Sequence, residues 1–308
     1  MKARILALAV AFCALWSTPA YAWDELGHRV VARIAWENMT PAARARAVQL
    51  LRAAPPRTGL AALMPSQGTE EERMRDWFIM AAVWPDMVRG RDNPASVYGH
   101  SDWHYVNFFW QVGPDGRPVD RDDIPRAGLL IDQAQRIAGE LGNASVPDSA
   151  QAIDLAWALH LVGDAHQPLH NNARITAQDT AGDRGGNDFR LGGVYPYNNL
   201  HGYWDSLVGH AVPWAMADRS ESDYVGSISR RLMAEWPRAR FASRLLPGQF
   251  ETWSREGFRV AQNAYPSWLV RNQRAPERYL PYAWNLAEPR IVLAGYRLAD
   301  LLNRTLGR

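Results

Sequence analysis

From residue 24 onward, apolar side chains recur at the three- and four-residue spacing of an α-helix along most of the chain. In residues 24–38, for example, Leu26, Val30 and Ile34 fall near one helix face. Similar patterns, with Thr40-Pro41 as a capped helix start, predict further helices over 41–53, 69–83, 125–141, 148–166, 220–236, 248–263 and 285–304. The sequence therefore predicts an all-α, mainly helical protein.

Two regions interrupt the helical pattern. Residues 84–124 are polar and aromatic, with many glycines and prolines, and residues 171–200 are rich in Gly, Asn and Asp. We expect loops in both, with a short β-hairpin in 171–200. A length of 308 residues allows one large domain or two small ones. Since no repeat or linker divides the chain, we expect a single domain over 23–308.

The N-terminus has the features of an export signal. Lys2 and Arg4 precede an apolar run over 5–16, and Ala20-Tyr21-Ala22 supplies a small-residue cleavage site. We expect residues 1–22 to be removed, which makes Trp23 the new N-terminal residue and sends the protein to the periplasm or the medium.

Neither the signal nor the rest of the chain predicts a membrane anchor. The apolar run is too short to span a bilayer, and no later stretch has about 18 uninterrupted apolar residues. The only cysteine, Cys13, lies inside the signal, so the processed protein is expected to fold without a disulfide. This lack of cysteine and the form of the signal indicate a bacterial protein.

The charge balance excludes one way of binding nucleic acid. The chain has 34 basic and 32 acidic side chains, and the signal carries two of the basic ones, Lys2 and Arg4. The rest of the chain is therefore neutral and is not expected to attract phosphate through a broad basic surface. Any phosphate binding must come from a local site.

Four of the eight histidines lie in two short segments that have the spacing of a metal centre. His160 and Asp164 are four residues apart on one predicted helix face, and His201 and Asp205 repeat this spacing. A single pair of this kind is more often a solvated helical ion pair. Two pairs, together with His170, favour a metal site, and zinc accepts mixed His/Asp ligands.

Three further candidates lie upstream. Asp86 follows a proline in the WPD sequence, where a helix is expected to have ended and the side chain can point into a cleft. His104 lies between two aromatic residues, a water-poor setting, and His28 is five residues from Trp23. Taken singly, Asp86 is also compatible with an exposed helix cap and His104 with a packed core histidine.

Together these segments form a recognisable set of motifs. In chain order they are WDELGHRVVARIA, WPD, WHYVNF, HLVGDAHQPLH, DRGGND, NLHGYWDS and LAGYRLADLLN. The sequence closely resembles the secreted trinuclear-zinc single-strand nucleases and 3′-nucleotidases, the nuclease S-one/P-one family, over nearly all of 23–308. The resemblance implies a single catalytic domain with the helical fold shared with zinc phospholipase C.

The resemblance also implies three Zn²⁺ ions and a ligand set for each. The first ion would be held by Asp86, His104, His160 and Asp164. The second would be held by His170, His201 and Asp205. The third would be held by His28, Asp164, and the amine and carbonyl oxygen of Trp23. Three dications among three aspartates would create a concentrated positive centre that attracts a phosphodiester.

The activity implied is hydrolysis of single-stranded DNA and RNA without sequence specificity, to give 5′-phosphates, together with cleavage of 3′-nucleotides. A zinc cluster can activate a water and stabilise the attacking and leaving oxygens, and Asp86 would orient or deprotonate that water. The resemblance further implies that Arg89 and Asn187 contact the phosphate, that Gly186 allows close backbone approach, and that Tyr105 stacks on a base.

Other interpretations remain at this point. Arg89 is also compatible with a solvated surface side chain, Gly186 and Asn187 with a simple turn, and Tyr105 with a core position. A zinc phospholipase C shares the ligand pattern, and a non-catalytic exported zinc-binding protein would share the metal sites. No feature marks an oligomer interface, so we expect a monomer.

Overall fold

The computed structural model describes residues 23–90, 92–214 and 220–307. The predicted signal peptide, residues 1–22, lies outside the described residues. Across the described ranges, no helix combines the length and the apolar character that crossing a bilayer requires.

The eight predicted helices are all present. They are α1 (Glu25–Asn38), α2 (Pro41–Arg52), α3 (Glu70–Ala81), α5 (Leu130–Glu140), α6 (Asp148–Asp164), α9 (Glu221–Glu235), α10 (Phe250–Ala261) and α11 (Tyr279–Leu306). The described residues also contain short helices that the pattern did not predict, namely α4 (Trp84–Met87), α7 (Leu200–Asp205) and α8 (Leu207–Ala211). These are too short to show a periodic pattern. The mainly helical fold class is confirmed.

Local side-chain chemistry explains where several helices begin. Asp24 accepts a hydrogen bond from Gly27 N at the start of α1 (3.1 Å), and Thr40 caps α2. Helix α11 begins six residues earlier than the sequence pattern predicted. Pro281 lies in its first turn, where no backbone donor is needed, and the helix continues through Pro289.

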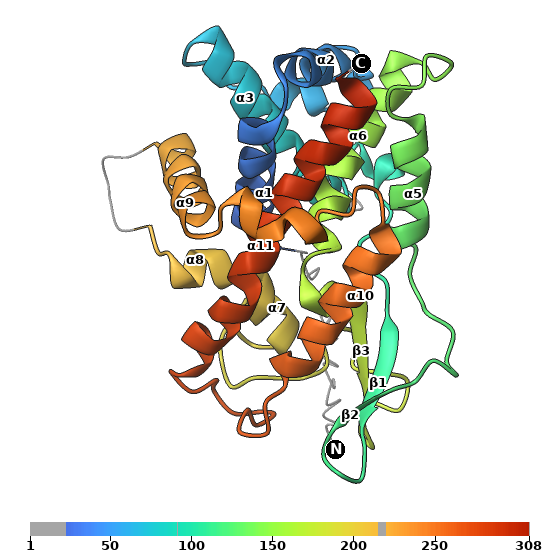
Figure 1. Cartoon of the computed structure of the whole chain (residues 1–308), viewed down its shortest axis with the longest axis vertical. Coiled ribbons are helices and arrows are strands. Elements are labelled where there is room, and N and C mark those ends of the chain that lie inside the picture. The colour runs from blue at the N-terminus through green and yellow to red at the C-terminus, as the bar shows by residue number, and fades with distance from the viewer. Residues whose placement is uncertain (1–22, 91, 215–219, 308) are drawn as a thin grey trace, which may run out of the picture.

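Helix α6 lies in the interior and packs against α1, α2, α5 and α11. Helices α1 and α11 run side by side through the middle of the molecule (Figure 1). They approach closely at Gly295, where an added Cβ would come within 2.5 Å of the Ile34 side chain. Every residue from 154 to 164 in α6 is buried, which places the end of this helix deep in the protein.

A small sheet lies beside α10, with strands in the order β2 (Pro118–Asp120), β1 (Phe108–Val112) and β3 (Asn172–Ile175). Strand β1 pairs antiparallel with β2 and parallel with β3. The predicted hairpin within 171–200 was wrong, because β3 pairs with β1 instead. Arg174 of β3 also binds Asp183: its backbone N–H donates to the Asp183 carboxylate, and its carbonyl accepts from Asp183 N. The only antiparallel pairing described inside 171–200 is a single bridge between Arg190 and Asn199.

Candidate metal centre

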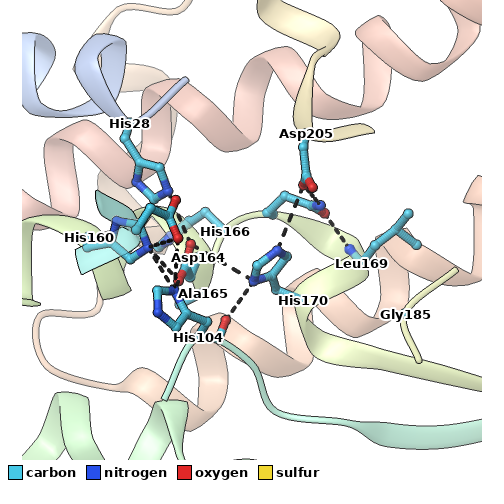
Figure 2. A network of polar contacts seen from close by, with 12 residues as sticks. His28, His104, His160, Asp164, Ala165, His166, Leu169, His170, Gly185 and Asp205 are labelled. Atoms are coloured by element: carbon cyan, nitrogen blue, oxygen red, sulfur yellow. Dashed lines mark hydrogen bonds and ion pairs between the residues drawn. The ribbon is translucent and has the colours of Figure 1, made fainter. Parts of the chain in front are cut away.

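Five predicted ligands from separate segments meet at the end of α6. His28 comes from α1, Asp86 from α4, His104 from the segment before β1, and His160 and Asp164 from α6. Figure 2 shows His28, His104 and His160 converging on Asp164. All five are at most 5% exposed. Helix α3 ends at Ala81, before Asp86, as predicted, but Asp86 lies within the further single turn of α4, which Pro85 helps to start.

The Asp164 carboxylate lies at the centre of this group. Its Oδ1 is 3.3 Å from His28 Nε2, and its Oδ2 is 3.2 Å from both His104 Nδ1 and His160 Nε2. Asp86 Oδ1 lies 3.7 Å from His104 Nδ1 and 3.8 Å from His160 Nε2. The ligand atoms are thus close enough to share bound cations.

Backbone carbonyls fix the imidazoles that face this centre. His160 Nδ1–H donates to Ala82 O (2.8 Å), and His170 Nδ1–H donates to His104 O (2.6 Å). A carbonyl can only accept a hydrogen bond, so in each neutral ring Nε2 carries the free lone pair. Such second hydrogen bonds are typical of histidines that bind metals.

A second group forms beside the first. His201 and Asp205 lie on α7, and His170 lies on the 3₁₀ helix η4 (Pro168–Asn171) that follows α6. His170 Nε2 is 3.8 Å from Asp205 Oδ1, and His201 Nε2 is 3.5 Å from Asp205 Oδ2. His170 lies between Asp164 and Asp205 (Figure 2), and its Nδ1 is 3.9 Å from Asp164 Oδ1. The two groups are therefore adjacent.

Two residues that the sequence analysis did not single out contact the candidate ligands, one in each group. Gln167 Nε2 donates to Asp205 Oδ1 (2.6 Å), and its Oε1 accepts from Leu169 N (2.5 Å). Gly163 lies so close to His28 that an added Cβ would be 2.8 Å from His28 Nδ1. A glycine inside a helix between two ligands was a usable signal, whereas nothing in the sequence distinguished Gln167 from other polar residues.

The predicted mature N-terminus lies at this centre. Trp23 is fully buried against Gly27, one turn before His28, and Asp24 N donates to Asp205 O (3.0 Å). The start of the processed chain would therefore lie between α1 and α7, next to ligands of both groups.

The chemistry of the donor atoms fits bound metal ions. His28, Asp86 and His160 form one compact set, His104, His160 and Asp164 a second, and His170, His201 and Asp205 a third. The Asp164 oxygens, His170 Nε2 and Asp205 Oδ2 are buried but make no hydrogen bond of normal geometry, although histidine nitrogens lie close to the Asp164 oxygens. Buried polar atoms left in this way are costly unless a cation satisfies them. Imidazole nitrogen and carboxylate oxygen suit zinc.

The surroundings of the site shift the pKa values of its ligands in different directions. Burial alone would lower the pKa of His160, but the carboxylates of Asp164 and Asp86 raise it. Burial lowers the pKa of His104 to about 4 and that of His201 to about 3, so both are neutral and able to bind metal. Burial alone would raise the pKa of Asp164, but the imidazoles of His160 and His170 hold it well below its usual range. Burial raises the pKa of Asp205 well above its usual range, so a cation there would take the place of a proton.

The predicted substrate contacts lie around the centre without forming part of it. Arg89 Nη1 donates to Asp86 Oδ1 (3.0 Å). Asn187 Nδ2 donates to Arg184 O within its own loop (2.9 Å), next to Gly186, whose φ is +84°. The half-buried Tyr105 lies with its ring over Gly128.

His166 lies between candidate ligands in the sequence, but both of its ring nitrogens bind other groups. Its Nδ1–H donates to Val162 O (2.7 Å), and its Nε2 accepts from Arg297 Nη1 (2.9 Å).

Buried groups of histidines and aspartates that could hold several metal ions are typical of metal-dependent enzymes, and phosphate-ester hydrolases with two-metal sites are one class of these. Comparison with protein families matches residues 23–307 to the S1/P1 Nuclease family. The chain belongs to this family, whose members depend on metal ions, and is a nuclease that hydrolyses phosphodiester bonds in nucleic acids.

Individual relatives agree with this assignment. The chain is 22% identical to Endonuclease 2 of Arabidopsis thaliana over 93% of its own length and 91% of the relative's. It is 25% identical to Nuclease S1 of Aspergillus oryzae, over 66% of this chain and 60% of that protein. These relatives come from a plant and a fungus, so a bacterial origin stays a prediction.

Proposed function

We propose that the protein is a zinc-dependent endonuclease that cleaves single-stranded DNA and RNA without sequence specificity, leaves 5′-phosphates, and also acts on 3′-nucleotides. The observation that carries the proposal is the convergence on Asp164 of histidines from α1, α6 and the segment before β1. A neutral protein with such a local centre binds phosphate there and not over a broad surface.

We infer three Zn²⁺ sites. Asp86, His104, His160 and Asp164 would hold one ion, and His170, His201 and Asp205 a second. His28, Asp164 and the amine and carbonyl oxygen of Trp23 would hold the third. Bound zinc supplies an activated water at neutral pH and stabilises negative charge on the phosphate.

The chain's own residues then orient the reactants. Asp86 would accept a hydrogen bond from the attacking water, and its contact with Arg89 holds that carboxylate in place. Arg89 would also donate to a phosphate oxygen, since a guanidinium suits bidentate phosphate binding. As the new oxygen–phosphorus bond forms, the attacking water gives up a proton, the bond to the 3′ oxygen breaks, and that oxygen takes up a proton.

Single-strand preference would come from base stacking. Asn187, on the loop with Gly186, would position the phosphate from the other side of the centre. Tyr105, next to His104, would stack on a nucleobase, which requires an unpaired strand but tolerates any base. We expect this residue to set strand preference more than catalytic rate.

We further propose that signal cleavage after Ala22 activates the protein outside the cytoplasm. The new Trp23 amine would become a ligand, because an α-amine has a pKa of about 7.7–8.0 and loses its proton readily beside a dication. The processed protein would be a secreted or periplasmic monomer.

The test uses processed protein that begins at Trp23. Zinc analysis should find about three ions per chain, and excess chelator should abolish cleavage that added zinc restores. A chain that retains Ala22 should lose one ion, because its Trp23 nitrogen is then an amide. Full activity with zinc shown to be absent contradicts the proposal.

Parallel substrates test the specificity. Single-stranded DNA and RNA should be cleaved faster than duplex DNA, and a 3′-nucleotide should release phosphate. A choline phospholipid should not react. Cleavage of the phospholipid in preference to every nucleotide substrate would favour the phospholipase C alternative.

A further inference from the structure

Two buried arginines, Arg290 and Arg297, bind the turn that joins the two metal-ligand groups. This ligand turn (residues 164–170) begins at Asp164 of the first group and ends at His170 of the second. All of its residues are buried, so water cannot satisfy its backbone. Its geometry therefore depends on protein donors.

Every backbone carbonyl from Leu161 to Gln167 accepts a hydrogen bond. Amides of the same turn donate to the carbonyls of Leu161, Gly163, Asp164 and Gln167. Asn171 Nδ2 donates to the Ala165 and Gln167 carbonyls (3.2 and 2.8 Å). The carbonyl of His166 accepts from Arg290 Nε (3.4 Å), and that of Ala165 also accepts from Arg290 Nη2 (3.4 Å). Arg290 thus spans two successive carbonyls in the middle of the ligand turn.

Arg297 holds the same turn through a side chain. Its Nη1 donates to His166 Nε2 (2.9 Å), while His166 Nδ1 binds Val162 O in α6. Arg290 and Arg297 are 2% and 0% exposed. Glu256 of α10 pairs with both, accepting from Arg290 Nη1 at 2.7 Å and from Arg297 Nη2 at 2.9 Å.

Burying two guanidinium groups beside one shared carboxylate costs desolvation free energy that apolar side chains would not. A rigid, planar guanidinium group can bind several acceptors at once, which fixes the backbone of the ligand turn. The partly negative carbonyls at the C-terminal end of α6 also attract cations. We propose that Arg290 and Arg297, aligned by Glu256, are positioning residues that set the separation of Asp164 and His170 for metal binding.

This inference rests on the proposed metal centre, and its test includes measurements that do not need activity. Arg290→Met removes both backbone contacts, whereas Arg244→Gln serves as a matched control. Arg244 pairs with the same Glu256 (3.3 Å) through a half-exposed side chain, and its own side chain makes no described contact with the ligand turn.

We expect Arg290→Met to weaken zinc binding in a chelator competition by about 10–100-fold, the usual effect of removing a residue that supports metal ligands. Amide hydrogen exchange of the metal-free protein should quicken in the ligand turn. Arg244→Gln should leave both properties near those of the unmodified protein.

Kinetics separate positioning from general stability. In Arg290→Met, kcat should fall while KM stays within about twofold, because the residue does not touch the substrate. Arg290→Lys should recover part of the zinc affinity, since an ammonium group reaches fewer acceptors than the guanidinium fork. If Arg290→Met does not fold, Glu256→Gln, which keeps the side-chain shape, should show the same changes to a smaller degree.

The inference is overturned if Arg290→Met, or Glu256→Gln in its place, binds zinc and exchanges its ligand turn like the unmodified protein while only the melting temperature falls. It is also overturned if Arg244→Gln causes an equal loss. Failure of the unmodified protein to bind zinc would instead contradict the proposed function, and hydrogen exchange would still test the positioning role.

Discussion

The two His–Asp pairs have the same spacing but are supported in different ways. His160 and Asp164 close the 17-residue helix α6, which is buried among other helices, so regular backbone geometry alone fixes their separation. His201 and Asp205 lie on α7, which has only six residues. A helix of that length is not stable by itself.

Tertiary contacts supply the missing support of α7. The Asn199 side chain caps the helix by accepting from Gly202 N (2.8 Å), and Gly185 O accepts from His201 Nδ1 (2.8 Å). Gln167, from the turn after α6, fixes Asp205. The comparison teaches that one spacing can predict ligands in both places while the rigidity of the second pair comes from other segments.

The strongest test of the comparison is Asp164→Asn, which removes the carboxylate that faces both groups. Loss of a metal-binding charge of this kind removes several kcal/mol of transition-state stabilisation, so we expect nuclease activity to fall about a thousandfold or more. Zinc analysis should show a loss of about two of the three proposed ions, because Asp164 is assigned to two of the three sites. Loss of a single ion would contradict that shared role.

Acidic pH should lower the unfolding free energy of the metal-free protein, because each group contains a buried histidine whose pKa is lowered. The pKa of His104 is lowered to about 4 and that of His201 to about 3. As the pH falls, these two histidines therefore become protonated in the unfolded chain before they do in the folded protein. The stability that the neutral histidines contribute is complete above pH 6.5 and is lost progressively below it, by about 1–2 kcal/mol for each residue between pH 6.5 and 5.

Urea unfolding of the metal-free protein across this range measures the effect. His104→Gln and His201→Gln should each reduce the pH dependence of the unfolding free energy. An unchanged dependence in both variants would show that other groups control acid stability.

Gly185→Ala should damage the second group selectively. Gly185 has a φ of +63°, and an added Cβ would lie 2.2 Å from Leu169 O, so the loop that holds His201 must move. We expect a loss of about 2 kcal/mol or more in unfolding free energy, together with weaker binding of one zinc ion.

Gly116→Ala is the matched control for Gly185→Ala. Gly116 has a similar φ of +80°, but nothing lies within 4 Å of an added Cβ. It should show a smaller loss of stability and unchanged zinc binding. Equal effects at both glycines would mean that backbone conformation alone, and not the contact with Leu169, causes the damage.

The smallest expected effect is at the cap of α7. Asn199→Ala removes the hydrogen bond to Gly202 N and should cost about 1 kcal/mol of stability. Thr40→Ala, at the cap of α2, should cost a similar amount without altering zinc affinity. If Asn199→Ala leaves the zinc affinity of the second group unchanged, the cap of α7 is not needed for metal binding.

The fold was largely readable from the sequence where helices were long and periodic. Residues 148–166 predicted α6 to within a few residues, and the i, i+4 spacing of His160 and Asp164 follows directly from helix geometry. The short helices α4 and α7 were not predicted, because one turn of helix has too few residues for a periodic pattern. The candidate ligands on these helices came from residue type and motif instead.

The sequence by itself determined the helical class and the candidate-ligand pairs one helical turn apart, because these depend on local spacing. Only the tertiary structure decided how His28, His104 and Asp164 meet, that β3 pairs with β1, and that His166 faces Arg297 and not the ligands. Those outcomes depend on contacts between segments far apart in the chain, where packing and the pairing of buried polar groups, and not local propensity, select the arrangement.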